Sequence, residues 1–168
     1  NLTAQKNKEV YTFSGGMRQR FGVAQALLGN PKIIIVDEPT AGLDPEERNR
    51  FNGLLSEIGS ERIVILSTHL VEDVRNLCSQ MAIMQNGKVL AQGKPSDFVA
   101  ELKGKIWQKE IQKEQLEVYK TNHNVIASHY IAGNLNIQVF SDEFLPDFET
   151  VNPTLEEVYF KTLNQVEL

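Results

Sequence analysis

Two short apolar runs constrain the fold of this chain more than any other feature. Residues 33–36 and 63–66 consist entirely of isoleucine, valine and leucine. A continuous run of this kind is typical of a parallel strand that is buried on both faces of a sheet. The segment between them, over about residues 45–58, has the apolar stripe of a helix, formed by Phe51, Leu54, Leu55 and Ile58. Strand, helix and strand in this order predict an α/β fold built on a parallel sheet.

Two more helices and a hairpin are predicted around these elements. One helix begins near Ser14 and stops at a Gly-Asn-Pro sequence, which breaks helices. Its expected apolar face is formed by Met17, Phe21, Ala24 and Leu28. A short helix over about residues 70–78 follows the second strand. Residues 80–92 favour a β-hairpin, because Asn86-Gly87 supplies the positive φ angles of a tight turn.

The composition of the chain changes after residue 93, and a domain boundary is expected within residues 94–104. A short helix is expected at residues 96–102, and later a final helix that opens with a capping-box pattern of Thr154 and Glu157. The expected strands of this part cover residues 106–111, 125–130 and 134–140. We therefore divide the chain into residues 1–94, which hold the parallel strands and the hairpin, and residues 95–168, a small accessory α+β module.

Charge and composition exclude several classes of function. The chain has 168 residues, 41% of them hydrophobic and 23% charged, which is the balance of a globular protein. A formal charge of −5 argues against a nucleic-acid partner, since phosphate binding calls for a basic surface. No apolar run approaches the roughly 20 residues that a membrane span needs, so a membrane role would require a partner protein. A single cysteine, Cys78, excludes an intrachain disulfide and favours a reducing compartment.

The first motif with chemical potential is Ser14-Gly15-Gly16-Met17, at the start of the first helix. Glycines at a helix N-terminus leave backbone N–H groups open to an anion, and the helix dipole favours its binding. The Ser14 hydroxyl could donate to the same phosphate. Alternatively, Ser14 is a plain N-cap and the glycines only shape a turn.

The second and third motifs follow the two apolar strands. Asp37 and Glu38 end the first strand, and His69 follows the second at the same sheet edge, where ligands of open α/β sheets bind. Asp37 could hold Mg²⁺. Glu38 could act as a general base toward a water that attacks phosphate, with His69 as a hydrogen-bond donor to that phosphate. The alternative is that these are ordinary acidic and polar residues of loops.

A fourth motif is the turn Ala41-Gly42-Leu43-Asp44, which leads into the helix after the first strand. Asp44 suits the N-cap of that helix, and Pro45 suits its first position.

Together, and in this order, the motifs resemble those of ATP-binding cassette (ABC) ATPases. Residues 14–16 resemble the signature motif of that family, Asp37-Glu38 the Walker B pair with its catalytic glutamate, residues 41–44 the D-loop, and His69 the switch histidine. The resemblance covers about residues 10–93. Met17 stands where the family more often has glutamine. The resemblance implies the partial parallel sheet of a P-loop NTPase, from the signature helix through the switch-histidine strand to the hairpin.

The resemblance also implies a function. It implies an ATP-binding and ATP-hydrolysing motor subunit of a membrane transporter, with ATP as substrate and Mg²⁺ as cofactor. Its partners would be a second ATPase subunit, arranged head to tail, and a transmembrane permease. It would lie in the cytoplasm, on the inner face of the membrane. The Gly-Lys-Ser/Thr of a Walker A loop does not occur in the sequence, so the chain alone is expected to be inactive.

The C-terminal module carries a weaker resemblance. Residues 152–159 resemble the ending of a branch of bacterial exporter ATPases, which implies export as the direction and a regulatory or dimerising role for the module. Two other functions remain open: a cassette ATPase that acts on nucleic acid or ribosomes, and a non-catalytic binding module. The sequence does not reveal the transported substrate or distinguish a homodimer from a heterodimer.

Overall fold

The computed structural model of the chain describes residues 2–164. Contacts divide the chain into two compact units, Asn1–Leu77 and Cys78–Leu168. The hairpin therefore groups with the second unit. The division at residue 94, drawn where the composition changes, stays a prediction. Residues 165–168 of the expected accessory module lie outside the described part.

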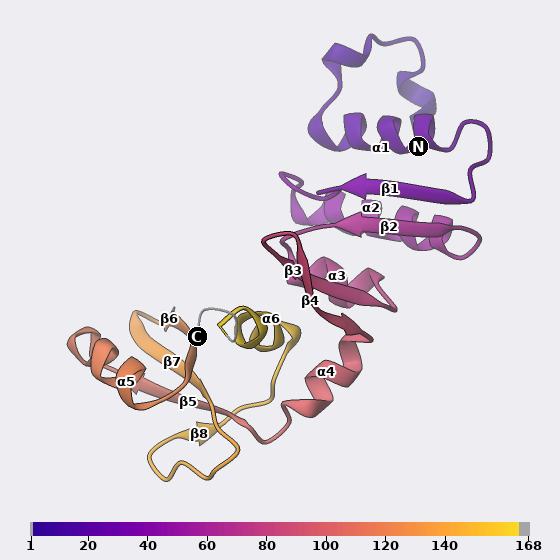
Figure 1. The fold of residues 1–168 in the computed structure, drawn as a ribbon. Helices are drawn as coiled ribbons and strands as arrows, with labels where there is room; N and C mark the ends of the chain where they lie inside the picture. Colours follow the sequence, from indigo (N-terminus) through magenta and orange to yellow (C-terminus); the bar gives the residue numbers. More distant parts are fainter. Residues whose placement is uncertain (1, 165–168) are drawn as a thin grey trace. The chain divides into compact units, whose positions relative to one another are not determined.

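The first unit is built around a pair of parallel strands. After two 3₁₀ turns (Thr3–Gln5 and Val10–Thr12), its elements are α1 (Gly15–Ala26), β1 (Ile33–Asp37), α2 (Pro45–Gly59), β2 (Ile63–Ser67) and α3 (Val71–Leu77). Strands β1 and β2 run parallel in a continuous register from Ile33 opposite Ile63 to Asp37 opposite Ser67 (Figure 1). The strand–helix–strand prediction is confirmed.

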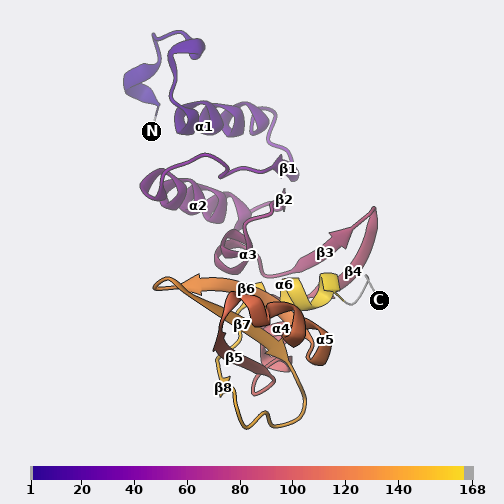
Figure 2. The same cartoon turned by 90° about the vertical axis from the view of Figure 1, so that its left-hand side faces the viewer.

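Only one face of this strand pair is covered within the described residues. Figures 1 and 2 show α2 running along one side of β1 and β2. The core on that side contains Val23, Ile34, Phe51, Leu55 and Ile58. The isoleucines of the other face are more than half exposed: Ile33, Ile35, Ile63 and Ile65. The prediction of burial on both faces is therefore wrong for this chain, because no described element packs on the second face.

The predicted apolar face of α1 is also wrong. The helix buries Gly16 and Val23, with Leu27 packed against the same core, whereas Leu28 is 78% exposed. Leu28 lies beyond the last helical residue, Ala26, so it does not continue the helical spacing. The face that α1 turns toward α2 begins at a glycine, which an apolar-periodicity argument does not detect.

The second unit begins with the expected hairpin and contains a four-stranded sheet. Strands β3 (Met81–Gln85) and β4 (Lys88–Gly93) pair antiparallel, and Asn86 and Gly87 between them have φ of 50° and 74°. Then come α4 (Pro95–Glu101), β5 (Ile106–Ile111), a 3₁₀ turn (Lys113–Gln115), α5 (Leu116–Asn122), β6 (Val125–Ile131), β7 (Asn134–Phe140), β8 (Glu149–Thr150) and α6 (Leu155–Asn164). The sheet order is β6-β7-β5-β8, and its pairs are antiparallel.

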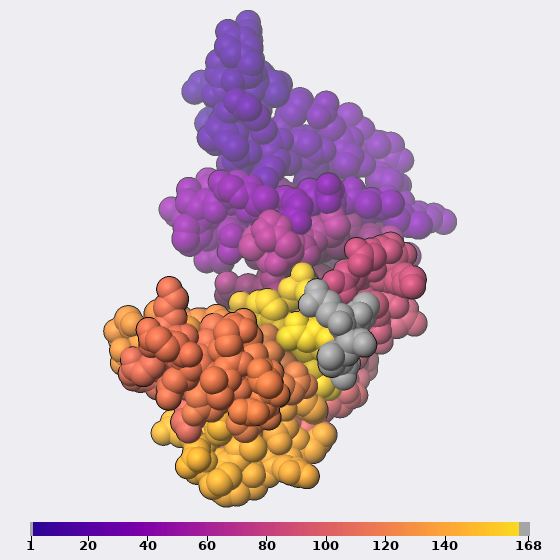
Figure 3. Space-filling model, turned by 60° about the vertical axis from the view of Figure 1, so that its left-hand side comes forward, coloured from indigo at the N-terminus to yellow at the C-terminus, as the bar shows by residue number. Residues whose placement is uncertain are grey.

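The two central strands of this sheet, β5 and β7, supply most of the core of the second unit. Ile111, Leu135, Ile137 and Val139 form one cluster, against which α5 packs through Leu116 and Tyr119. Helix α6 contacts β6, α4 and the hairpin, and Figure 3 shows it in yellow beside the orange strands. At its start, the Glu157 carboxylate accepts from the Thr154 backbone N–H at 2.7 Å, as the capping-box pattern predicts. No helix in the described part of the chain is both long and apolar enough to span a bilayer.

Candidate active site

The ends of β1 and β2 bring the predicted acidic pair and the histidine together. Asp37 lies opposite Ser67 in the register, and the Ser67 hydroxyl donates to Asp37 Oδ1. The Glu38 backbone N–H donates to the Ser67 carbonyl at 2.9 Å, so the pairing extends one residue past the strand. Because parallel strands end at one edge of a sheet, the side chains that follow them meet there.

Glu38 is held in an unusual conformation that turns the chain sharply after β1. Its φ is 44°, in the left-handed region that non-glycine residues seldom adopt, and such residues concentrate at functional sites. Its Oε1 accepts from the His69 backbone N–H at 3.0 Å and lies 2.8 Å from His69 Nδ1. Oε2 accepts from the Thr68 hydroxyl at 3.4 Å. The segment after β2 thus supplies every side-chain partner of this carboxylate among the described residues.

The contact with Glu38 fixes which nitrogen of His69 carries a proton. An ionised carboxylate only accepts hydrogen bonds, so Nδ1 is the protonated nitrogen and donates. Nε2 is then free of this contact. The His69 side chain is 68% exposed and that of Glu38 is 35% exposed, so both can be reached by a ligand at the strand ends.

Asp37 fits the coordination of a magnesium ion. Oδ1 accepts from Ser67, which leaves Oδ2 without a hydrogen-bond partner in the described part of the molecule, and the residue is exposed. Mg²⁺ prefers hard oxygen ligands and usually binds one or two carboxylates together with substrate phosphates and water. No cluster of three or more His, Cys, Asp or Glu side chains suited to a metal occurs among residues 2–164. Asp37 therefore offers one carboxylate of the kind that Mg²⁺ takes as a ligand.

The turn after Glu38 leads into α2 with the expected capping. Gly42 has a φ of 73°, and the Leu43 N–H donates to the Thr40 carbonyl at 3.2 Å. Asp44 is the N-cap of α2, its Oδ1 accepting from the Glu47 N–H at 2.8 Å, and Pro45 takes the first helical position. The Gln19 side chain of α1 donates to the Ala41 carbonyl at 3.3 Å. The turn is therefore linked to the helix that carries the glycine motif.

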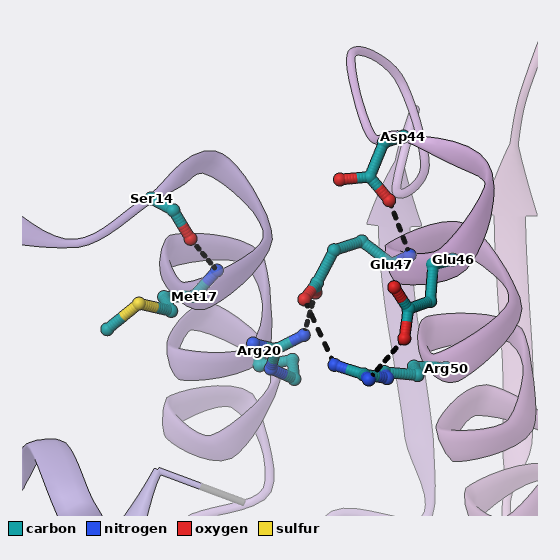
Figure 4. A network of polar contacts seen from close by, with 7 residues as sticks. All are labelled: Ser14, Met17, Arg20, Asp44, Glu46, Glu47 and Arg50. Atoms are coloured by element: carbon teal, nitrogen blue, oxygen red, sulfur yellow. Dashed lines mark hydrogen bonds and ion pairs between the residues drawn. The ribbon is translucent and has the colours of Figure 1, made fainter.

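Residues 14–17 form the first turn of α1. Ser14 is the N-cap, and its hydroxyl accepts from the Met17 N–H at 3.3 Å (Figure 4). Gly15 has open space where a Cβ would stand, whereas a Cβ on Gly16 would lie 2.6 Å from Glu47 Oε2. The plain N-cap alternative is thus realised for Ser14, and Gly16 has a packing reason to be glycine. Neither observation excludes an anion at Gly15, whose surroundings are open.

An ion-pair network joins α1 to α2 beside this turn. Glu47 of α2 pairs with Arg20 of α1 and, at 3.5 Å, with Arg50 of its own helix (Figure 4). The Arg20 and Glu47 side chains are only 17% and 24% exposed, so solvent screens this pair less than a surface pair. Together with the Gln19–Ala41 contact, it links the glycine motif to the turn after Glu38.

The described residues bring some predicted site residues together and keep others apart. Asp37, Glu38 and His69 are joined as expected, whereas no hydrogen bond or ion pair in the described part of the chain links them to residues 14–17. Two residues of the site region were not anticipated: Thr40 and Asp73, which are both fully buried and hydrogen-bonded to each other. In the sequence, the one signal for the contact of Asp73 with Thr40 is that Asp73 follows His69 by four residues, and this signal is weak.

Comparison with known proteins shows what this chain is similar to. Residues 1–41 match the family model described as ABC transporter. The chain is 39% identical to Nod factor export ATP-binding protein I of Cupriavidus pinatubonensis, over 58% of this chain and 30% of that protein. It is homologous to ABC transporter ATPase domains. That family hydrolyses ATP.

Two further relatives extend the comparison. The ABC transporter ATP-binding protein YxlF of Bacillus subtilis is 31% identical over 94% of this chain and 59% of its own length. The solved structure of cbiO1 from Clostridium perfringens, part of the ABC transporter complex cbiONQ, has a TM-score of 0.54 at 36% identity and covers 59% of this chain and 40% of that one. The likeness confirms the P-loop NTPase relationship of the fold. The chain spans about a third of the first relative and somewhat more than half of YxlF.

Proposed function

We propose that this sequence is the hydrolytic part of an ATP-driven motor subunit of a membrane transporter. The observation that carries the proposal is the accessible Glu38 carboxylate, held at the strand ends by two contacts from His69 and placed next to Asp37. An ABC ATPase needs a carboxylate that can face a water molecule beside the terminal phosphate of ATP. Glu38 is the side chain in this chain that meets that need.

In the proposed reaction, water attacks the γ-phosphorus of ATP and the bond to the ADP oxygen breaks. Glu38 orients this water and accepts its proton. Asp37 would hold Mg²⁺, which supplies positive charge to the phosphate oxygens when it is bound. His69 keeps the Glu38 carboxylate in place through Nδ1–H. Its Nε2 can donate to the γ-phosphate only when the ring carries both protons, because Nδ1 already uses the first one.

The signature segment, residues 14–17, is assigned to the ATP site of a second ATPase subunit, arranged head to tail. The open surroundings of Gly15 at the start of α1 support an approach by phosphate from outside the chain. Its connection to the turn after Glu38, through the hydrogen bond from Gln19 to Ala41, would couple the two ATP sites of such a dimer. Whether the second subunit is a copy of this chain is left open.

The wider setting is proposed from the relatives. The subunit would lie in the cytoplasm, bound to the inner face of the membrane through a transmembrane permease, and would serve export. Export is the function in the name of one relative, and the ending at residues 152–159 fits the exporter branch. The accessory module would regulate the motor or help it dimerise. The match to YxlF over 94% of the chain supports its assignment to the same subunit.

A chain of these 168 residues is proposed to bind ATP weakly by itself, because the sequence contains no Gly-Lys-Ser/Thr with a glycine-rich lead. The uncovered isoleucine face of β1 and β2 is assigned to the phosphate-binding part of the cassette, because an exposed apolar face of this kind marks an interface. A titration with Mg-ATP tests the first statement, and submicromolar affinity would contradict it.

The direct test of the proposed function is ATP turnover by the full-length subunit carrying Glu38→Gln. We expect kcat to fall by roughly 10²- to 10⁴-fold, the contribution typical of general-base catalysis. Glu46→Gln is the matched control, because Glu46 is an exposed carboxylate in the first turn of α2 whose one ion pair among residues 2–164 is with Arg50. Full turnover by the Glu38→Gln variant would remove Glu38 from the mechanism.

A further inference from the structure

A buried polar contact lies behind the candidate active site. The Thr40 hydroxyl donates to Asp73 Oδ2, and the Asn52 amide donates to Asp73 Oδ1 at 3.4 Å. Thr40 and Asp73 are both 0% exposed, and Asn52 is 9% exposed. A buried carboxylate is costly unless it is hydrogen-bonded, so each of these donors matters for keeping Asp73 where it is.

This carboxylate connects the three segments that carry the proposed chemistry. Thr40 stands two residues after Glu38 and opens the turn to α2, whereas Asp73 lies in the first turn of α3, four residues after His69. Asn52 belongs to the middle of α2, the helix that the turn enters. One side chain therefore ties together the loop of Glu38, the segment of His69 and the helix that begins at Asp44.

The backbone conformation of Glu38 has to be held by neighbouring residues, and the contact of Thr40 with Asp73 can do this. A left-handed φ at a glutamate persists only where the surrounding structure holds it. On one side the Glu38 N–H is bonded to Ser67, and on the other the chain passes through buried Pro39 to Thr40. Among the described residues, two side-chain hydrogen bonds hold the loop after Glu38: one from the Thr40 hydroxyl to Asp73 and one from the Gln19 amide to the Ala41 carbonyl. The Thr40 bond is the buried one and lies nearer to Glu38 in the sequence.

We propose that Asp73 is a positioning residue for ATP hydrolysis, acting through Thr40 on Glu38 and through α3 on His69. It touches neither nucleotide nor water. Its role is to fix the angle between the Glu38 carboxylate and the His69 ring, on which the placement of the attacking water depends. The inference rests on the proposed function, since it needs an ATPase in which Glu38 acts.

The test compares Thr40→Val with Thr40→Ser in the full-length subunit. Valine keeps the shape of threonine and removes the donor to Asp73, whereas serine keeps the donor. Because a displacement of about 1 Å in a catalytic group can cost on the order of 100-fold in rate, we expect Thr40→Val to lower kcat by roughly 10- to 100-fold. The KM for ATP should change little, and Thr40→Ser should restore most of the lost kcat.

Two further variants test whether the loss of kcat arises from the contact between Thr40 and Asp73. Asp73→Asn should lower kcat in the same direction as Thr40→Val, and the double variant should be no worse than the poorer single one, because both changes break one contact. Glu72→Gln is the matched control, since Glu72 is the exposed neighbour of Asp73 and pairs only with Arg75. If Thr40→Val does not fold, Thr40→Ala replaces it, because it removes the donor without placing a methyl group against the carboxylate.

The outcomes separate this inference from the function on which it rests. If the wild-type subunit does not hydrolyse ATP, the proposed function fails. If the wild type hydrolyses ATP and the folded Thr40 variant without a hydroxyl keeps its kcat, the positioning role of Asp73 is overturned. An equal loss of kcat in Thr40→Ser and Thr40→Val also overturns it, because the hydroxyl would then be irrelevant.

Discussion

The two units of the chain treat their apolar strands differently. In the second unit, Ile106, Ile137 and Val139 are at most 1% exposed, so the central strands β5 and β7 bury these side chains. In the first unit, Ile35 is 74% exposed and its neighbours on the same face are more than half exposed. The second unit therefore closes its own core, whereas the first closes only the face that α2 covers.

The two units also differ in which of them carries the candidate catalytic residues. The strand ends of the first unit carry the accessible Asp37, Glu38 and His69, and its residues make the matches to the family model. The second unit places apolar side chains and amides, such as Gln108 bonded to Asn136 at 3.3 Å, on its central strands. The unit with the proposed chemistry is therefore the one whose isoleucine face is uncovered, and its stability depends on additional surface that covers this face.

Dividing the chain between Leu77 and Cys78 gives the largest expected effect. We expect the peptide of residues 78–168 to unfold in one cooperative thermal transition, since its core is closed. The peptide of residues 1–77 should lack such a transition or aggregate, because its exposed isoleucine face remains uncovered. Circular dichroism during heating measures both. A cooperative thermal transition of the isolated peptide of residues 1–77 would contradict the expectation that this unit needs its isoleucine face covered.

Two matched substitutions compare the stability cost of losing one isoleucine side chain in each unit. Ile137→Ala removes a fully buried side chain and should lower the free energy of unfolding of the second unit by about 2–5 kcal/mol. Ile35→Ala, on the exposed face, should cost less than about 1 kcal/mol in the same 168-residue chain. Denaturant titration with a probe in each unit measures both values. Similar costs at the two positions would show that the Ile35 face is covered in solution.

The smallest expected effect concerns the part of the first unit that is well packed. Ala in place of Gly15 meets nothing within 4 Å, whereas Ala in place of Gly16 displaces the Glu47 carboxylate that pairs with Arg20. We expect the Gly16→Ala chain to be about 1 kcal/mol less stable than the Gly15→Ala chain, the scale of one partly buried ion pair. Thermal unfolding of both variants measures the difference. Equal stability would mean that the contact between α1 and α2 does not depend on Gly16.

Much of the fold could be predicted from local sequence patterns. The β-branched runs, the Asn86-Gly87 turn and the pairing of Thr154 with Glu157 each act over a few residues, and the structure has the elements they predict. Helix α5, at residues 116–122, was missed.

The wrong and missed predictions depend on neighbours that are distant in the sequence, which a local pattern does not contain. The run at 33–36 predicts burial, but which face is covered depends on elements distant in the sequence. The apolar face of α1 was misplaced because the helix packs through Gly16, Val23 and Leu27, beside the Arg20–Glu47 ion pair, and not through the expected residues. Asp73 looks like an ordinary acidic residue in the first turn of a helix, and only the fold brings Thr40 to it. The meeting of Asp37, Glu38 and His69 was predictable, because parallel strands end at a common edge, whereas their catalytic roles remain a proposal.

The central claim is that this sequence supplies a hydrolytic glutamate to one ATP site and a signature motif to the other. The most direct measurement uses the full-length subunit with Glu38→Gln and follows its mass by light scattering as Mg-ATP is added. We predict conversion from monomer to dimer, because ATP is bound without being hydrolysed, and no conversion when Ser14→Arg is added. A Glu38→Gln subunit that binds ATP and stays monomeric, or a double variant that still dimerises, would contradict the account.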